Sequence, residues 1–270
     1  LSFSTLSTRT VLDTLIRLGV FVGMLIMMML WEARAPRRQL RYSRWQRWPI
    51  NIGLSAITAM LLRLSIGGIA YFAAILASEM EFGLLNMLVL PQWLSLVVAL
   101  ISLDLALFGQ HLAMHRWPLL WRLHKVHHTD LDFDVTTAVR FHPVEIILSL
   151  VYKVIIISLL GAPALAVLIF ELILSTSALF NHGNIMIPVR WDKRLRWLLV
   201  TPDMHRIHHS STQTETDSNF GFSISIWDRL FGTYIGEPAL GQKGMKIGLS
   251  QFRYSSAVTL KKLLLMPFKP

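Results

Sequence analysis

The sequence predicts an all-α, integral-membrane helical bundle with a helical cap on its cytosolic side. The first reason is composition: the 270 residues are 53% hydrophobic and 16% charged, with a mean hydropathy of +0.50. A chain this apolar belongs to the membrane class rather than to ordinary soluble domains. The other reasons are a series of apolar runs, enough for about four to five membrane helices or hairpins, and an uneven distribution of charge between the connecting loops.

Five apolar runs follow one another along the chain. They are Leu18–Trp31 (extended backward by Val11–Ile16), Ile52–Leu76, Trp93–Phe108, Ile146–Leu160 and Ala164–Phe180. Each is near the lower limit for crossing a bilayer, which requires about 20 residues. The last two meet at Gly161, Ala162 and Pro163, a joint that breaks a helix and predicts a tight hairpin. The first is followed by charged residues instead of a small-residue cleavage site, which is typical of a signal anchor.

Charge in the loops predicts the orientation of these helices. The loop after the second run carries Glu79 and Glu81 and no Lys or Arg. The loop after the first run is crowded with arginines, namely Arg34, Arg37, Arg38, Arg41, Arg44 and Arg47. By the positive-inside rule the arginine loop is cytoplasmic. Counting the runs forward then returns the chain to the cytoplasm near Gln110 and again near Asn181.

One structural domain in four parts is therefore expected. Residues 1–110 form the N-terminal transmembrane helices, 111–145 a cytosolic histidine-rich segment, 146–181 a membrane hairpin, and 182–270 the cytosolic cap. The net charge of +10 fits contact with an anionic membrane surface. The basic residues form no recognisable nucleic-acid-reading motif, so no nucleic-acid partner is expected. A multi-pass location in a bacterial inner membrane is favoured, and the endoplasmic reticulum stays open.

The ten histidines are confined to the chain after residue 110. They occur as HLAMH, HKVHH, RFHP, FNHGN and HRIHH, which contain His111, His115, His124, His127, His128, His142, His182, His205, His208 and His209. The topology, derived without these residues, brings all of them to the same membrane face. Histidines with unrelated structural roles are not expected to segregate in this way.

The spacing within the clusters indicates metal binding. On a helix, residues i and i+4 share a face, as do i and i+3, so His111 and His115 can hold one ion. In HKVHH, the adjacent pair His127 and His128 diverge by about 100° around the helix axis, so one helix can serve two metals. HRIHH repeats the arrangement. Together with His182 the clusters supply nine imidazoles, which fit two metals better than one.

Isolated histidines have a simpler interpretation. His142 stands alone and is more typical of a hydrogen-bonded structural residue than of a ligand, although ligation stays open. His182 also stands alone, but its place at the return of the hairpin favours ligation. For the three clusters the main alternative to metal binding is pH sensing.

The available donors narrow the chemistry. The chain has no Cys, so a metal must be held by His, Asp or Glu, which suits iron, manganese or zinc. A zinc hydrolase typically has three protein ligands and a carboxylate base, as in HExxH, and no such Glu lies within the clusters. Two metals in an all-nitrogen setting at a lipid interface favour oxidation of a lipid C–H bond by O2. A dimetal lipid hydrolase or isomerase, and a non-catalytic metal-binding membrane protein, stay open as alternatives.

At this point the motifs become recognisable. From about Asp104 to Tyr234 the chain resembles the fatty acid hydroxylase / sterol desaturase superfamily, the membrane histidine-box di-iron oxygenases. The resemblance rests on LLWRLHKVHHTDLDFDVTTAVRFHPVE, FNHGN, TPDMHRIHHS and SNFGFSISIWDRLFGTY, together with boxes of the form HxxxH, HxxHH and HxxHH. It covers about half of the chain.

The resemblance implies a cytosolic cap that holds two iron ions (Fe2+/Fe3+). O2 is the implied co-substrate, a lipid or sterol-like molecule enters from the bilayer, and a separate electron-transfer protein supplies electrons. The reaction is hydroxylation or desaturation. The implied catalytic and metal-binding residues are His111, His115, His124, His127, His128, His182, His205, His208 and His209. In this chain Ala178 stands four residues before His182, where some members have a further histidine, so water, Asn181 or His142 would complete the second metal.

Supporting residues are expected around the ligands. Imidazole ligands usually donate their second N–H to a carboxylate or carbonyl. Candidates for this role are Asp104, Asp130, Asp203, Asp228 and Asn181. For Asp104, which lies within an apolar run, the alternative is an ion pair with an arginine. Phe220, Trp227 and Phe231 are expected in the core of the cap.

Overall fold

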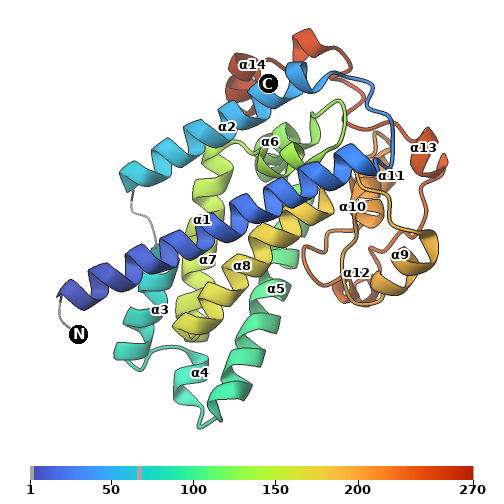
Figure 1. Cartoon of the computed structure of the whole chain (residues 1–270). Helices are drawn as coiled ribbons and strands as arrows, with labels where there is room; N and C mark the ends of the chain where they lie inside the picture. The colour runs from blue at the N-terminus through green and yellow to red at the C-terminus, as the bar shows by residue number, and fades with distance from the viewer. Residues whose placement is uncertain (1–2, 66–68, 270) are drawn as a thin grey trace.

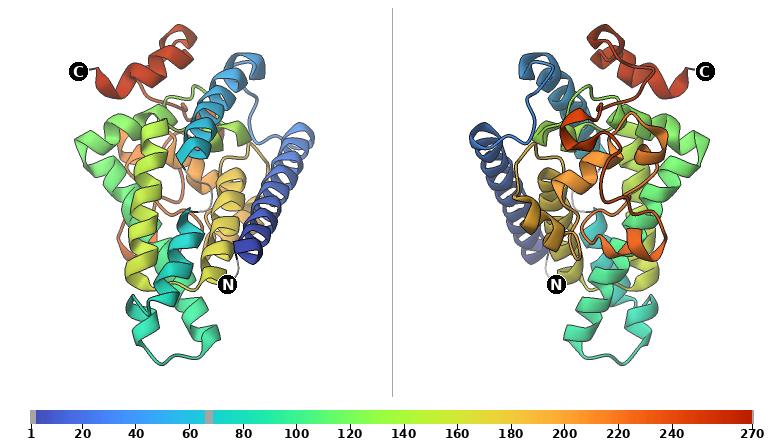
Figure 2. Two further views of the ribbon diagram at one scale, coloured as in Figure 1. Left: turned by 90° about the vertical axis from the view of Figure 1, so that its left-hand side faces the viewer. Right: turned by 90° about the vertical axis from the view of Figure 1, so that its right-hand side faces the viewer.

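The structure, a computed structural model, describes residues 3–65 and 69–269, without the side chains of residues 3–12, 63–65 and 257. Five segments are long and apolar enough to cross a membrane, namely Asp13–Arg34, Ile69–Met87, Gln92–Arg116, Pro143–Leu160 and Ala164–Asn181. They belong to α1 (Phe3–Arg34), α3 (Ile69–Glu79) with α4 (Leu84–Met87), α5 (Gln92–Arg116), α7 (Pro143–Leu160) and α8 (Ala164–Asn181). Figure 1 shows them as a bundle, and Figure 2 shows the short helices gathered toward one end and one flank. The predicted all-α membrane bundle is confirmed.

The hairpin between α7 and α8 forms at the predicted joint. α7 ends at Gly161, whose φ of +65° is a left-handed conformation that glycine adopts without steric cost. A Cβ on Gly161 would also lie 2.9 Å from the backbone oxygen of Phe82. Glycine at this position therefore allows both the turn and its close packing against the loop before α4.

The second apolar run departs from the prediction. Ile52–Leu76 was expected to be one run, but it is divided between α2 (Arg44–Ser65) and α3, and residues 66–68 lie outside the described residues. The candidate span is Ile69–Met87, and α2 is not among the candidates. The physical reason is that α2 begins at Arg44, before the apolar run, and its first turns carry polar residues such as Arg47 and Asn51, which are buried.

A buried polar network joins α2 to the segment after the HKVHH cluster. Arg47 Nε lies 2.7 Å from Asp130 Oδ1, and its Nη1 lies 2.6 Å from Asp134 Oδ2. Asn51 donates to Asp130 and accepts from Arg140. Asp134 also caps the 3-10 helix Val135–Val139. The network therefore fixes the chain that leaves the histidine-rich helix.

Replacing Arg47 with alanine is expected to destabilise the protein by about 3–5 kcal/mol, because two buried carboxylates lose their cation. Thermal unfolding of the detergent-purified protein measures this effect. Arg41→Ala is the matched control, since Arg41 is exposed and belongs to the same arginine-rich loop. Equal unfolding temperatures for the two variants would contradict the proposed role of the network.

Four charged residues pair with one another inside the spanning bundle. Glu171 of α8 contacts both Lys153 of α7 and Arg17 of α1. Arg17 also pairs with Asp13 at 2.7 Å. Two positive and two negative groups offset each other, which reduces the large cost of charge within a bilayer. This cluster connects the tilted α1 to the α7–α8 hairpin.

The remaining helices are short and form the cap. They are α6 (Pro118–His128), α9 (Val189–Leu195), α10 (Pro202–His208), α11 (Gln213–Thr216), α12 (Ile226–Leu230), α13 (Gly241–Gly244) and α14 (Leu260–Leu265), with 3-10 turns at Val135–Val139, Ser255–Ala257 and Met266–Phe268. α6, α7 and α10 each begin with proline, whose fixed φ suits the first helical position.

The arginine-rich loop also contacts the cap. Arg37 pairs with Asp203 at the start of α10, and Arg38 donates to the carbonyl of Met245. Arg47 belongs to the network described above. The loop therefore lies on the same side of the bundle as the cap, which is the relative arrangement that the loop charges predicted.

Candidate metal centre

Nine of the ten histidines converge into two adjoining groups. The first histidine group is His111, His115, His124, His128 and His208, and the second histidine group is His127, His182, His205 and His209. Within each group one ring nitrogen per residue lies within 4.8 Å of all the others. The rings of His128 and His209 stack at 4.5 Å between centroids, so the two groups share a boundary.

Helix periodicity explains how the groups are divided. His111 and His115 lie one turn apart on the last turns of α5, which continues through them to Arg116. α6 sends His124 and His128 to the first group and His127 to the second. α10 and the residue after it, His209, do the reverse: His208 joins the first group, and His205 and His209 join the second. His182 follows the last residue of α8.

The outward-facing nitrogens of six of these histidines are held by the protein. Their Nδ1 atoms lie within hydrogen-bonding distance of carbonyl or carboxylate oxygens. The pairs are His111 with Phe220 O (2.8 Å), His115 with Asp217 Oδ1 (3.3 Å), His124 with Glu145 Oε1 (2.6 Å), His127 with Arg140 O (3.1 Å), His182 with Ala178 O (2.7 Å) and His208 with Ser218 O (2.7 Å). Such contacts fix ring orientation and direct the Nε2 atoms inward.

The inward-facing Nε2 atoms of His127 and His182, in the second histidine group, lie close together but have no proton with which to form a hydrogen bond. A carbonyl oxygen can only accept, so His127 and His182 each carry their proton on Nδ1 and present a lone pair at Nε2. These two Nε2 atoms lie 3.1 Å apart, and His205 Nε2 lies 3.1 Å from that of His182. Two lone pairs at this distance repel each other. A cation between them removes the repulsion, so the donor set fits a metal ion.

Protonation of these imidazoles does not relieve this repulsion at neutral pH, because their pKa values are low. Burial, reinforced by neighbouring imidazoles, lowers the pKa of His127 and His205 well below the usual 6.5. Burial likewise lowers the pKa of His182 to about 4. These three imidazoles are therefore neutral near pH 7, which is the form that binds metal.

The first group repeats this arrangement around His124. Its Nε2 lies 3.2 Å from His111 Nε2 and 3.2 Å from His128 Nε2. Phe220, which is fully buried, packs its ring against His111, His115 and His208. The expectation that Phe220 belongs to the core is confirmed, and this core lies directly against the first group.

The predicted supporting residues do not contact the histidine rings. Asp104 accepts from the indole of Trp227 (2.8 Å), so neither a histidine nor an arginine is its partner. Asp130 pairs with Arg47, and Asp203 pairs with Arg37 and Arg206. Asn181 donates to the carbonyl of Phe222. These predictions were wrong because sequence proximity to a ligand does not determine which way a carboxylate points.

Asp228 acts on the site indirectly. Its carboxylate accepts from the backbone N–H groups of Phe220 and Gly221, at 2.7 and 2.8 Å. The carbonyl of Phe220 in turn receives His111 Nδ1. Asp228 therefore shapes the loop that orients a ligand, although it does not contact the imidazole itself.

Two acids that do contact histidines of the first group were missed. Glu145 lies in the first turn of α7 and reaches His124, and Asp217 follows α11 and reaches His115. Glu145 is 3% exposed, a rare environment for an unpaired acid. The signal in the sequence was an acid at the start of an apolar helix, two residues after RFHP.

The structure separates His142 from both groups. Its Nδ1 accepts from the backbone N–H of Val144, which makes it the N-cap of α7, and its Nε2 lies 3.2 Å from the carbonyl of Leu264. Both nitrogens therefore have protein partners, as the structural interpretation of an isolated histidine predicts.

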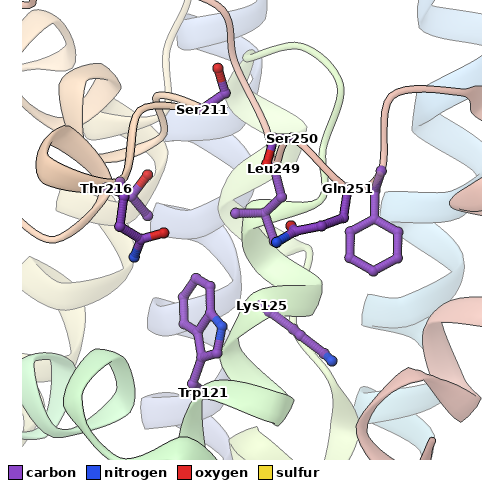
Figure 3. A pocket seen from close by; sticks show the side chains of 9 residues that line it. Trp121, Lys125, Ser211, Thr216, Leu249, Ser250 and Gln251 are labelled. Atoms are coloured by element: carbon purple, nitrogen blue, oxygen red, sulfur yellow. The ribbon is translucent and has the colours of Figure 1, made fainter. Parts of the chain in front are cut away.

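A polar cavity of about 250 Å³ lies beside the first group. Figure 3 shows Trp121 and Lys125 on one side of it, facing Ser211, Thr216, Leu249, Ser250 and Gln251. The ring of Trp121 lies 4.9 Å from that of His115 and 5.5 Å from that of His128, between centroids. Trp121 therefore lies between the cavity and these two histidines.

Comparisons with known proteins match this part of the chain. An ornithine lipid hydroxylase of Rhizobium tropici is 30% identical over 151 residues, which cover 55% of this chain and 44% of the relative. Alkylglycerol monooxygenases of Xenopus tropicalis and Homo sapiens are 28% and 26% identical, over 51% and 52% of this chain and 30% of each relative. The matched part thus spans less than half the length of these relatives. No solved structure matches the chain at a significant level.

The family model for fatty acid hydroxylases matches residues 96–233, just over half of the chain. This stretch includes every member of both histidine groups. The chain therefore belongs to the fatty acid hydroxylase family.

Proposed function

We propose that the chain oxidises a C–H bond of a membrane lipid with O2, by hydroxylation or desaturation, at two iron ions. The first histidine group would hold one ion and the second histidine group the other. The observation that carries this proposal is the inward convergence of nine imidazoles, six of which place their Nε2 atoms 3.1–3.2 Å from the Nε2 atom of a neighbour. The residues that assemble the groups all lie within the stretch that matches the family.

The donor set supports redox chemistry over hydrolysis. All nine converging donors are imidazole nitrogens, and the chain contains no thiolate that an oxidant could destroy. The carboxylate of Glu145 points to the outer nitrogen of His124, so it orients a ligand and is not free to act as a base on the inner side. When bound, iron supplies the oxidising power that acid–base groups lack.

The substrate and its route follow from the position of the site. The histidines lie at the cap ends of α5 and α8, so a lipid that enters between the spanning helices reaches them directly. The names of the relatives favour polar membrane lipids, such as aminoacyl lipids or glycerol ethers, over free sterols. The cytoplasmic orientation of the cap rests on the arginine-rich loop, by the positive-inside rule.

Electrons are required because the reaction balances only with a reductant. Hydroxylation converts R–H, O2, two electrons and two protons into R–OH and water. We propose that a separate electron-transfer protein supplies the electrons. The solvent-open cavity beside Trp121 offers such a protein an approach to the first histidine group.

Lipid profiling with isotopic oxygen tests this function. Membranes that contain the protein, a reductant and 18O2 are expected to accumulate either a lipid that is 18 mass units heavier because it carries one 18O atom, or one that is two units lighter. The lighter product indicates desaturation. Product formation without O2 would contradict an oxygenase and favour a dimetal hydrolase or isomerase. Bound metal without any modified lipid would favour a non-catalytic binding protein.

A metal transporter is one form of the non-catalytic alternative, and the helix bundle gives it limited support. A transporter is expected to place polar groups along a path through the membrane. The charged residues Asp13, Arg17, Lys153 and Glu171 do lie within the spans, but they neutralise one another in pairs. The converging histidines lie at one end of the bundle.

A further inference from the structure

The cap carries an exposed apolar surface on the flank formed by α9 and α12. It contains ten large apolar residues that are 37–70% exposed: Met186, Val189, Trp191, Leu195, Trp197, Leu198, Leu199, Ile226, Leu230 and Phe231. We call these residues the α9–α12 surface. Phe231 was expected in the core of the cap, but it is 58% exposed and packs by one face only, on Phe108. A surface of this kind marks a binding site for a membrane or a protein.

The position of α12 indicates that the partner is the lipid bilayer. Trp227 donates to Asp104, and Phe231 stacks on Phe108 at 5.2 Å between centroids. Asp104 and Phe108 lie 12 and 8 residues before Arg116, where α5 ends. At 1.5 Å per residue, α12 lies about 12–18 Å down the axis of a spanning helix from its cap end. Figures 1 and 2 show α9 and α12 beside α5 and α8, not beyond their ends. The apolar surface is thus continuous with the spanning bundle.

Basic residues border this surface, as expected at a lipid headgroup layer. The guanidinium groups of Arg190 and Arg194 lie over the ring of Trp191, at 5.9 and 5.1 Å. Arg229 lies over Trp197 at 4.5 Å. Aromatic and basic side chains together are typical of helices that lie in the membrane interface.

A basic pocket opens among these residues. It has a volume of about 280 Å³ and is lined by Lys193, Arg196, Trp197, Arg229, Tyr234, Gly236 and Glu237. Arg196 is 3% exposed and held in place by Asp192 and by the carbonyl of Gly236. Its Nε, and that of Arg229, are buried and have no hydrogen-bond partner among the described residues. Unsatisfied buried donors beside a lysine indicate a missing anionic acceptor.

We propose that the α9–α12 surface is seated in the membrane leaflet and that the basic pocket binds the phosphate of a phospholipid headgroup. The acyl chains of that lipid would lie along the apolar residues beside α5. The proposal goes beyond the oxidation reaction and needs no bound metal. It assigns the flank of the cap a role in holding the membrane, and with it the lipid, next to the histidine groups.

Depth-dependent fluorescence quenching tests the seating. The full chain is reconstituted in phospholipid nanodiscs whose acyl chains carry bromine near the headgroup. Trp197→Phe is expected to remove part of the quenchable tryptophan fluorescence. Trp45→Phe, a control at an 89% exposed position at the start of α2, is expected to leave the quenchable part unchanged. If Trp197→Phe also leaves it unchanged, the surface is not in the leaflet and the proposal fails.

Binding of a short-chain phospholipid tests the pocket. The detergent-purified chain is titrated with dihexanoyl phosphatidylglycerol, with dihexanoylglycerol and with inorganic phosphate. The phospholipid is expected to bind most tightly, and the double change Lys193→Gln with Arg229→Gln should weaken it about 10- to 30-fold. The matched double change Arg190→Gln with Arg194→Gln removes the same charge outside the pocket and should have little effect. Equal binding of dihexanoylglycerol or of inorganic phosphate, or equal losses in both variants, would overturn the assignment.

Discussion

Substituting His124 with alanine is expected to abolish lipid oxidation and to remove iron from the first histidine group. His124 is central to that group, because its Nε2 lies 3.2 Å from those of both His111 and His128. Its loss also leaves Glu145 buried without its partner. Iron content per purified chain and the rate of product formation both measure the effect, and the iron content should fall even when no substrate is present.

His142→Ala is the matched control for this experiment. It removes the same side chain from the one histidine that belongs to neither group. Because His142 caps α7, its loss is expected to cost about 0.5–2 kcal/mol of stability. Iron content and product formation should persist. Equal loss of iron in the two variants would mean that metal binding depends on the fold in general and not on the two histidine groups.

Glu145→Ala is expected to weaken iron binding about 10- to 100-fold, which is typical when an outer partner of a ligand is removed. Glu145 Oε1 lies 2.6 Å from His124 Nδ1, and both side chains are buried. Without it, the imidazole loses both its fixed orientation and the negative charge that strengthens it as a ligand. Competition with a chelator measures the affinity. Glu145→Gln keeps an acceptor oxygen, so its iron affinity should lie between that of the alanine variant and that of the wild type.

Asp104→Asn controls for the loss of a buried acid. Asp104 is 3% exposed, as is Glu145, but it contacts Trp227 instead of a histidine. Iron affinity should therefore stay near the wild-type value. A loss as large as that of Glu145→Ala would restore Asp104 as a supporting residue and contradict the contacts described above.

Local periodicity explains why the sequence could predict so much of the candidate site. Residues i and i+4 of a helix face the same way regardless of what surrounds the helix. The relative directions of the histidines in HLAMH, HKVHH and HRIHH can therefore be predicted from the sequence alone. The divergence of adjacent histidines also predicted that one helix serves two ions. The structure divides His127 from His128, and His208 from His209, in this manner.

Contacts between distant segments were not predictable in the same way. Glu145 meets His124 only because α7 packs beside α6, and Asp217 meets His115 across 102 residues of chain. Conversely, Asp130 lies two residues after His128 but pairs with Arg47 of α2. The start of α2 at Arg44, ahead of the apolar run Ile52–Leu76, was missed for a related reason: hydropathy alone does not reveal that Arg47 and Asn51 are buried.

Metal analysis of the purified full chain tests the central claim most directly. The claim is that imidazoles from α5, α6, α8 and α10 hold one ion in each of two adjoining groups. Protein produced with sufficient iron is expected to contain two irons per chain, with X-ray absorption showing coordination dominated by nitrogen. A folded chain that binds a single ion, or whose iron is coordinated mainly by oxygen, would contradict it.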